Sequence, residues 1–350
     1  MSQGRIIATA RVLPVAHEIL SRYARIEIAS ATDENSLVSM MDGAIGLIVR
    51  GVTPITRRVI EAGTNLRVIG RTGVGFDNVD INAATECGIP VVFAPGAGSK
   101  AVAEGALSML LALAKRLPQL DQKTRAGQWQ VRDEISMGDL YGATLGLVGL
   151  GRIGSEVARL AKAFGMNIIG YDPAVSEGKA KSIGVKLADL DSLLKESDFI
   201  SVHAPLNDET RGMFDARRLA LVKRGAILVN LARGGLLSSL DVLNEALESG
   251  RLAGVGLDVY PTEPPDVSHP IFRRSDVIST PHCMGLSVKA AHATFTMVSQ
   301  GMADVFSGGT PENIANPQVY SKRGNSREDH RGEKNRVGRR GIKPPSRSVK

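Results

Sequence analysis

Short runs of apolar and β-branched residues alternate along most of the chain with segments whose apolar residues have helical spacing. The first predicted strands are Arg5–Thr9, Arg25–Ala29, Ala44–Val49, Leu66–Gly70 and Val91–Phe93, with helical segments such as Leu13–Tyr23 and Ile55–Ala62 between them. The later predicted strands are Thr144–Gly149, Asn167–Tyr171, Phe199–His203, Ala226–Leu231, Gly254–Val259 and Val277–Thr280. Repeated strand–helix–strand order is typical of parallel sheets covered by helices. The pattern therefore predicts an α/β protein with doubly wound parallel sheets.

Two long helical segments separate and follow these two series of strands. One is predicted over Lys100–Ala126 and ends at Gly127, and the other is predicted over Ser287–Phe306. A chain of 350 residues is long enough for two domains. We therefore expect one domain to combine residues 1–97 with 289–320, a second domain to comprise 98–288, and the two long helices to join them.

The regular pattern stops after Gly308, and residues 321–350 are polar and rich in Arg, Lys, Gly, Ser and Pro. Such a segment buries too little apolar surface to offset the entropy lost on ordering, which predicts a disordered tail. The tail carries 11 basic and 3 acidic side chains, whereas the first 320 residues carry 32 basic and 33 acidic ones. The net charge of +7 therefore comes from the tail and does not indicate nucleic acid binding by the domains. The tail has two interpretations. It is either an arm that binds nucleic acid or an acidic partner, or a solvated or adventitious extension.

Neither membrane insertion nor secretion is expected. The longest largely apolar run, Ala106–Ala114, has nine residues including Ser108, whereas a transmembrane helix needs about 20. The first residues lack the long apolar segment of a secretory signal. The two cysteines, Cys87 and Cys283, lie far apart and lack the spacing of metal ligands. We therefore expect a cytoplasmic protein without a metal site.

A glycine-rich turn follows the predicted strand Thr144–Val148, where residues 149–154 read Gly-Leu-Gly-Arg-Ile-Gly and open a helix. In this context Gly149 permits the tight turn, Gly151 lets the backbone approach a pyrophosphate, and Gly154 lets the helix pack on the strand. The helix N-terminal amides would face the phosphates. Asp172 ends the next strand, 23 residues after Gly149, and a carboxylate there accepts hydrogen bonds from ribose hydroxyls and repels a 2′-phosphate. The pattern predicts a dinucleotide site that prefers NAD to NADP.

Three polar side chains follow three of the later strands, at the edge where open α/β sheets bind ligands. Arg233 comes after Ile227–Leu231, Glu263 after Val255–Val259, and His282 after Val277–Thr280. Together with the longer motifs Gly70–Asp80 (GRTGVGFDNVD), His203–Leu206 (HAPL) and Leu247–Arg251 (LESGR), these residues give the chain a specific resemblance. From about Ala44 to Pro317 it resembles the D-isomer-specific 2-hydroxyacid dehydrogenases, in particular their phosphoglycerate dehydrogenase-like branch. That resemblance implies two Rossmann-like domains and a homodimer.

The resemblance also implies that Arg233, Glu263 and His282 form the catalytic set. Oxidation of a 2-hydroxy acid requires removal of the hydroxyl proton as a hydride leaves C2 for the nicotinamide. His282 can act as that base, because imidazole titrates near the working pH. Glu263 would orient the ring and favour its protonated form. Arg233 offers a planar fork that holds a carboxylate and polarises the 2-oxygen.

Further contacts are carried over from the family. Beside the three glycines and Asp172, the expected NAD contacts are Val74, Arg152, Ile153, Ala204, Pro205, Thr210, Leu231, Ala232, Arg233, Asp258, His282 and Gly285. Among these, Asp258 would hold the nicotinamide carboxamide. The expected substrate contacts are Arg50, Gly73, Val74, Gly75, Arg233 and His282. The amides of Val74 and Gly75 would cradle the substrate carboxylate, and Arg50 stands where phosphoglycerate-type members bind the phosphate.

Several alternatives stay open at this point. A solvated surface arginine is the alternative for Arg50. Cys283-Met284 and Ser238-Ser239 depart from the family pattern, so the acid is either 3-phosphoglycerate or an unphosphorylated acid such as glyoxylate, hydroxypyruvate or D-lactate. The resemblance is to a short form, so we expect no regulatory C-terminal domain like that of long phosphoglycerate dehydrogenases. An NAD-sensing, corepressor-like protein, which keeps the same three residues, is the alternative from another functional class, and formate dehydrogenase is disfavoured because it has Gln in place of Glu263.

Overall fold

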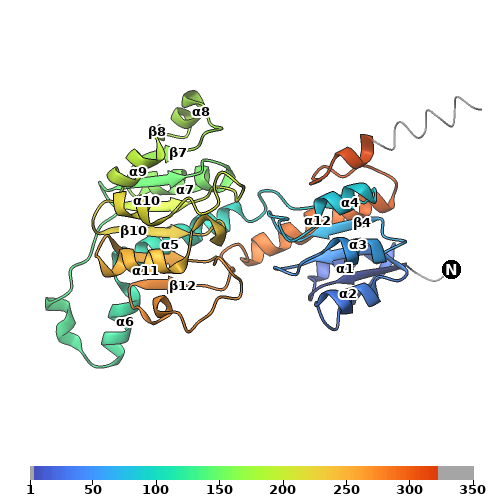
Figure 1. The fold of residues 1–350 in the computed structure, drawn as a ribbon, viewed down its shortest axis with the longest axis horizontal. Helices are drawn as coiled ribbons and strands as arrows, with labels where there is room; N and C mark the ends of the chain where they lie inside the picture. Colours follow the sequence, from blue (N-terminus) through green and yellow to red (C-terminus); the bar gives the residue numbers. More distant parts are fainter. Residues whose placement is uncertain (1–3, 322–350) are drawn as a thin grey trace, which may run out of the picture. The chain divides into compact units, whose positions relative to one another are not determined.

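The computed structural model describes residues 4–321, and these divide into two units (Figure 1). One unit contains the described chain up to Pro95 and again from Thr294 onward, and the other contains Gly96–Ala293. The predicted basic tail falls, from residue 322 onward, outside the described residues.

The first unit is built on a five-stranded parallel sheet. In chain order its elements are β1 (Gly4–Ala8), α1 (Pro14–Leu20), β2 (Ala24–Ile28), α2 (Glu34–Met40), β3 (Ala44–Val49), α3 (Arg57–Ala62), β4 (Val68–Arg71), α4 (Ile81–Glu86) and β5 (Val91–Val92). The strand order β2-β1-β3-β4-β5 is the doubly wound order of flavodoxin-like sheets. The chain changes its direction of travel between β1 and β3, so groups that follow these two strands lie at a switch point.

The helix α12 (Val288–Phe306) begins in the second unit's part of the chain, and its residues from Thr294 onward belong to the first unit. There it lies directly on the sheet. A Cβ atom added to Gly70 of β4 would lie 2.4 Å from Met302 Sδ and 2.7 Å from Val298 Cγ1. Glycine at this position therefore lets α12 lie against the strand.

The second unit is built on a seven-stranded parallel sheet. Its elements are α5 (Ser99–Ala114), α6 (Leu117–Arg125), η1 (Trp129–Asp133), β6 (Thr144–Val148), α7 (Arg152–Ala163), β7 (Asn167–Tyr171), α8 (Glu177–Ser182), β8 (Lys186–Leu187), α9 (Leu190–Glu196), β9 (Phe199–Val202), α10 (Ala216–Leu221), β10 (Ala226–Asn230), η2 (Gly234–Leu236), α11 (Leu240–Glu248), β11 (Leu252–Leu257), η3 (Pro270–Arg273) and β12 (Val277–Ser279). The order β8-β7-β6-β9-β10-β11-β12 is that of dinucleotide-binding sheets, with its switch point between β6 and β9.

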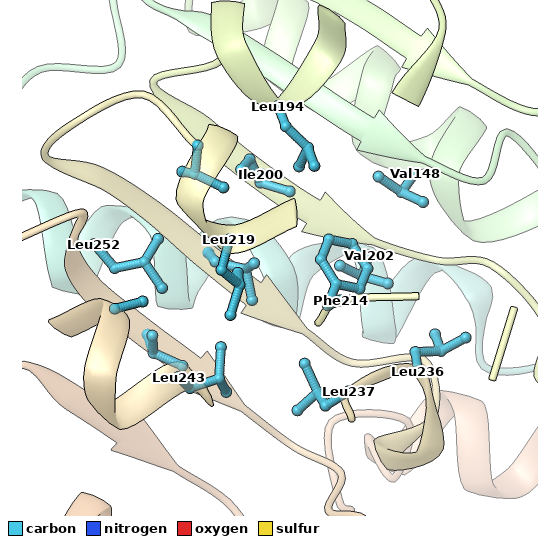
Figure 2. Packing of buried hydrophobic residues seen from close by; sticks show 14 of the residues in the cluster. Val148, Leu194, Ile200, Val202, Phe214, Leu219, Leu236, Leu237, Leu243 and Leu252 are labelled. Atoms are coloured by element: carbon cyan, nitrogen blue, oxygen red, sulfur yellow. The ribbon is translucent and has the colours of Figure 1, made fainter. Parts of the chain in front are cut away.

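Two apolar cores cover the two faces of this sheet. Along β10, Ala226 and Leu228 belong to one core, and Ile227 and Val229 belong to the other. This alternation is the period of two that a strand imposes on its side chains. Figure 2 shows the core that contains Phe214, which is fully buried, with side chains from α9, α10 and α11. Both faces are thus filled, as expected for the predicted doubly wound parallel sheet.

The predicted fold class is confirmed, and one predicted helix is wrong in its extent. The segment expected to be helical over Lys100–Ala126 is two helices, α5 and α6, because Arg116 adopts a left-handed conformation (φ 49°) between them. Pro118 explains the break. In a continuous helix its amide would donate to the Ala114 carbonyl, but proline has no amide hydrogen and its ring clashes with that carbonyl. The Ala114 carbonyl instead accepts a hydrogen bond from the Gly138 amide at 2.9 Å. The strand β8 was not predicted, because its two residues, Lys186 and Leu187, do not form an apolar run.

No helix within residues 4–321 is both long and apolar enough to cross a membrane.

Candidate active site

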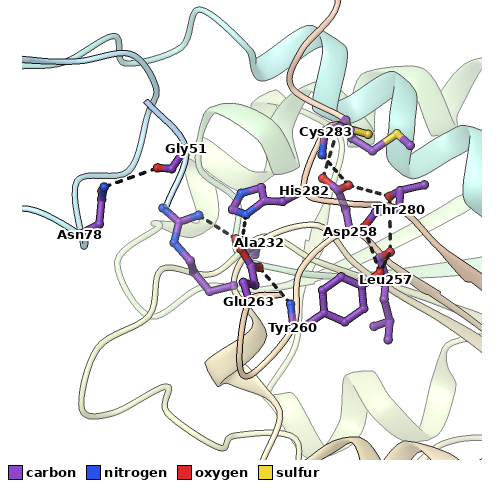
Figure 3. A network of polar contacts seen from close by, with 12 residues as sticks. Gly51, Asn78, Ala232, Leu257, Asp258, Tyr260, Glu263, Thr280, His282 and Cys283 are labelled. Carbon is purple, nitrogen blue, oxygen red and sulfur yellow. Dashed lines mark hydrogen bonds and ion pairs between the residues drawn. The ribbon is translucent and has the colours of Figure 1, made fainter. Parts of the chain in front are cut away.

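The loops after β10, β11 and β12 carry Arg233, Glu263 and His282 at the carboxyl edge of the second unit's sheet. The Glu263 Oε2 atom lies 2.8 Å from His282 Nδ1, and Glu263 Oε1 accepts a hydrogen bond from the Tyr260 amide at 3.1 Å. Figure 3 shows the His282 ring facing this carboxylate. The positive charge of Arg233 also acts on Glu263. The three side chains singled out in the sequence therefore form one electrostatic group.

Glu263 is held in its charged form. Partial burial by itself raises the pKa of this carboxyl, but the hydrogen bonds from His282 and Tyr260 and the charges of His282 and Arg233 together hold the pKa below its usual value. A carboxylate that accepts from Nδ1 fixes the tautomer of the ring and leaves Nε2 to gain or lose a proton. The His282 side chain as a whole is 42% exposed.

His282 has an unusual backbone. Its φ is 51°, in the left-handed region that non-glycine residues adopt at a cost of about 1–2 kcal/mol. The residue follows Pro281, and its amide donates to the Thr280 carbonyl at 3.1 Å. Such a conformation persists only where the surrounding contacts enforce it, and it is concentrated at functional sites.

The loop that carries Arg233 is fixed by the buried side chain of Asn230, the last residue of β10. Asn230 Nδ2 donates to the Arg233 carbonyl at 3.0 Å, and Asn230 Oδ1 accepts from the Ala232 amide at 3.1 Å. The next residue, Gly234, touches the loop after β11, since a Cβ atom there would lie 1.9 Å from the Tyr260 carbonyl carbon. A side chain at position 234 would therefore clash with the backbone of the loop after β11.

The glycine-rich turn between β6 and α7 has the shape of a phosphate cradle. Gly149 has a φ of 98°, and a Cβ atom there would lie 2.6 Å from the His203 carbonyl carbon. A Cβ atom on Gly154 would lie 2.1 Å from the Gly149 carbonyl oxygen, so α7 packs tightly on the turn. Gly151, at the N-terminus of α7, has nothing within 4 Å of its Cβ position. The turn is closed on the protein side and open on the other, which fits the pyrophosphate of a dinucleotide.

His203 follows β9 next to this turn. Its Nε2 atom lies 2.8 Å from Ser201 Oγ, while Nδ1 is shielded from solvent and has no hydrogen-bond partner. Burial lowers the pKa of the imidazole to about 4, so the ring is neutral at pH 7. This buried environment of His203 was not predicted from the sequence.

Asp172 lies where the sequence placed it, after β7, but its carboxylate already has partners. Oδ2 accepts from the Leu150 amide at 2.8 Å and Oδ1 accepts from the Ala174 amide at 2.9 Å. The residue therefore ties the glycine-rich turn to the end of β7. A carboxylate has about four acceptor positions, so two remain for a ribose.

The other expected NAD contacts of this unit lie on the same edge or beside it. Arg152 and Ile153 form the first turn of α7, Ala204 and Pro205 follow β9, Leu231 and Ala232 follow β10, Asp258 follows β11, and Gly285 lies beyond β12. Thr210 has a local role, since its Oγ1 donates to the Pro205 carbonyl at 2.7 Å. Within residues 4–321, no three His, Cys, Asp or Glu side chains are grouped so as to hold a metal ion.

In the first unit, Arg50 follows β3 at the switch point. Its amide donates to Thr9 Oγ1 at 2.9 Å, its Nη1 donates to the Arg11 carbonyl at 2.8 Å, and its guanidinium carbon lies 5.6 Å from the Phe295 ring centroid. The side chain is therefore held in place by contacts to neutral groups.

The expected carboxylate cradle, residues 73–75, follows the neighbouring strand β4. The side chain of Arg71 braces it, with Nη1 donating to the Thr72 carbonyl at 2.9 Å and Nη2 donating to the Gly51 carbonyl at 3.2 Å. Val74 is 41% exposed at the tip of the loop. Arg71 and Gly51 were not predicted to matter, because their contacts join two loops that are separate in the sequence.

Comparison with known proteins identifies the family. Residues 107–284 match the model of the D-isomer specific 2-hydroxyacid dehydrogenase NAD binding domain. A D-3-phosphoglycerate dehydrogenase of Methanocaldococcus jannaschii is 42% identical over 313 residues, which cover 89% of this chain and 59% of that protein. A hydroxypyruvate reductase of Thermotoga maritima is 40% identical over 270 residues, which cover 76% of this chain and 87% of that protein. The crystal structure of the TT0316 protein from Thermus thermophilus is similar with a TM-score of 0.83 and 34% identity, covering 89% of this chain and 99% of that one.

The chain belongs to the D-isomer specific 2-hydroxyacid dehydrogenase family. The second unit carries the family's NAD binding domain, so both the expected family and the expected cofactor class are confirmed. The chain spans a little over half the length of the D-3-phosphoglycerate dehydrogenases that it matches.

Acidification should destabilise the protein through His203. Its pKa in the folded state is about 4, below the 6.5 of an unfolded histidine, so the unfolded chain binds a proton first as the pH falls. The contribution to stability is complete above pH 6.5 and is lost between pH 6.5 and about 4, amounting to about 3 kcal/mol at 1.36 kcal/mol per pKa unit. Urea unfolding at several pH values should therefore show a smaller loss for His203→Gln than for the unsubstituted protein. His17→Gln, at an exposed histidine, is the control substitution. Equal pH slopes for His203→Gln and the unsubstituted protein would contradict the assignment of this stability change to His203.

Proposed function

We propose that the protein is an NAD-dependent D-2-hydroxyacid dehydrogenase. The observation that carries this proposal is the pairing of His282 Nδ1 with Glu263 Oε2 at 2.8 Å, with the charge of Arg233 on the same carboxylate. NAD, when bound, supplies the hydride acceptor. The first unit is the substrate domain and the second unit the NAD domain in this proposal.

His282 and Arg233 have complementary roles in the proposed reaction. The free Nε2 of His282 takes the proton of the substrate hydroxyl, and the adjacent Glu263 carboxylate stabilises the imidazolium that forms. In the reverse direction the protonated ring returns the proton to the 2-oxygen. Arg233 binds the substrate carboxylate and polarises the 2-oxygen.

The proposed cofactor contacts belong to the second unit. The amides of Gly151, Arg152 and Ile153 bind the pyrophosphate at the N-terminus of α7. The remaining acceptor positions of Asp172 bind the ribose hydroxyls and disfavour a 2′-phosphate. The apolar borders of the nicotinamide and adenosine sites come from the loops after β9, β10 and β12, through Ala204, Pro205, Leu231, Ala232 and Gly285.

The preferred substrate of the proposed enzyme is 3-phosphoglycerate or a related short acid with a second anionic group. The amides of Val74 and Gly75 bind the carboxylate. Arg50 binds the second anion, which agrees with a guanidinium whose contacts are to neutral groups. Relatives named D-3-phosphoglycerate dehydrogenase and hydroxypyruvate reductase support this substrate class.

A homodimer is part of the proposal, and the segment from α6 to β6 supports it. Of the large hydrophobic side chains exposed within residues 4–321, Leu117, Trp129, Met137 and Tyr141 lie in this segment. The helix α6 has no buried residue, and Figure 1 shows it extending from the sheet of its unit. A second copy of the chain would cover these side chains. A cytoplasmic location is also proposed, since Cys87 and Cys283 are free thiols.

The direct test is a panel of 2-oxo acids with NADH, measured by the loss of NADH absorbance. His282→Ala should lower kcat by about 10²–10⁴-fold, the scale of general acid–base catalysis. Arg233→Ala should lower kcat and also raise KM, because carboxylate binding is lost in the ground state. His292→Ala, at an exposed histidine, is the matched control. Near-native turnover of both variants, or no turnover with any acid, would instead favour an NAD-sensing, corepressor-like protein.

Substrate choice should depend on Arg50. A charge-assisted hydrogen bond is worth about 1.5–3 kcal/mol, so Arg50→Ala should lower kcat/KM for doubly anionic acids by about 10–150-fold. Glyoxylate and pyruvate should be almost unaffected. Equal losses for both kinds of acid would mean that Arg50 supports its loop, through its bond to the Arg11 carbonyl, and does not contact the substrate.

Self-association should depend on Trp129, which is 65% exposed. Truncation of a tryptophan that anchors an interface costs more than 1 kcal/mol, so Trp129→Ala should weaken the dimer by about fivefold or more. Sedimentation equilibrium measures this constant. Val267→Ala, at another exposed apolar position of the same unit, should leave it unchanged. A monomeric unsubstituted protein would refute the proposed dimer.

A further inference from the structure

Asp258, the first residue after β11, has an almost fully buried side chain, 2% exposed. Its carboxylate accepts three hydrogen bonds. Oδ1 accepts from Thr280 Oγ1 at 2.6 Å and from the Cys283 amide at 2.9 Å, and Oδ2 accepts from the Met284 amide at 3.1 Å. All three donors belong to the loop after β12, which Figure 3 shows beside Asp258.

These donors lie on both sides of His282. Thr280 precedes it by two residues, and the two amides belong to the residues that follow it directly. The carboxylate therefore closes a loop around the one residue of that segment with a left-handed backbone, φ 51°. The amides of residues 283 and 284 both point at this one buried acceptor, directly after the turn at His282.

The acceptor itself is rigidly placed. The Asp258 amide donates to the Asn230 carbonyl at 3.1 Å, which continues the pairing of β10 with β11. Glu263 belongs to the same loop after β11, five residues further on. The loop after β11 thus contacts the His282 segment in two ways. Asp258 binds the backbone next to His282, and Glu263 binds the His282 ring.

We propose that Asp258 is a positioning residue that sets the backbone of His282, so that Nδ1 meets Glu263 and Nε2 faces the substrate. This inference rests on the proposed dehydrogenase function. It differs from the role that the family resemblance implied, a contact to the nicotinamide carboxamide, because it acts in the protein before any cofactor binds. Asp258 thereby affects catalysis through His282 without touching the reacting atoms.

The test uses two substitutions in the full chain. Asp258→Asn keeps the shape of the side chain but places an amide group against one of the donors, and Thr280→Val removes the hydroxyl donor alone. Asp198→Asn is the matched control. Asp198 also accepts a hydrogen bond from a backbone amide, that of Thr144 at 2.9 Å, but it lies at the amino ends of the strands of the same sheet. ¹⁵N-histidine NMR of the cofactor-free protein reports the Nδ1 hydrogen bond of His282, with the signal assigned by its loss in His282→Gln.

The expected result is a change of the His282 Nδ1 signal in Asp258→Asn and a smaller change in Thr280→Val, with none in Asp198→Asn. Because a shift of about 1 Å in a reacting group can lower turnover 10²-fold, kcat of Asp258→Asn should fall by up to about 100-fold, while KM for the acid changes little. If Asp258→Asn does not fold, the signal of Thr280→Val decides alone.

The inference is overturned if the His282 signals stay unchanged in the variants while their affinity for NADH falls, since that is the behaviour of a cofactor contact. The NMR measurement needs neither substrate nor cofactor. An unsubstituted protein that reduces no 2-oxo acid would refute the proposed function, and the His282 signal would still decide the role of Asp258.

Discussion

The loops that leave β10, β11 and β12 pack so closely that one of them cannot carry a side chain where it meets the next. Gly234 lies against the Tyr260 backbone, and a Cβ atom at position 234 would be only 1.9 Å from the Tyr260 carbonyl carbon. This contact brings the loop of Arg233 to the loop of Glu263, and the 2.8 Å contact between Glu263 and His282 then adds the third loop. The parallel sheet supplies a common edge, but only this close packing makes the three side chains act on one another.

Buried polar side chains at the ends of the strands stabilise that packing. Asn230 ends β10 and satisfies the backbone of the Arg233 loop, and Asp258 follows β11 and satisfies the backbone of the His282 loop. A buried amide without an acceptor destabilises a protein by about 1–3 kcal/mol, so each of these loops has one strongly favoured conformation. The left-handed backbone of His282 is maintained in this way. Both loops thus have their backbone polar groups paired by buried side chains at the ends of β10 and β11.

The features that sequence reasoning identified are those carried by local patterns. Continuous apolar runs predicted β3 and β7 with their observed ends, and the spacing of glycines after β6 predicted the turn at Gly149. The break of the first long helix at Arg116 was missed, although Pro118 was the available signal. The hydrogen-bond partners of Asp258 could not be predicted for a different reason. They lie 22 to 26 residues further along the chain, and only the folding of the sheet brings them next to Asp258. Asn230 was equally hidden, although a polar residue that ends an apolar strand is a sign of a buried contact. The catalytic and binding roles of the named residues stay predictions.

The division of the first unit into two stretches of chain has a consequence for biosynthesis. Asn316 accepts a hydrogen bond from the Val91 amide at 2.8 Å and donates to the Ile89 carbonyl at 2.9 Å, while Met302 and Val298 lie against β4. The core of this unit therefore stays incomplete while the ribosome translates the whole of the second unit. The second unit, by contrast, is one continuous stretch from Gly96 to Ala293 and can fold as soon as it emerges. The amino-terminal strands, though made first, gain their final packing last.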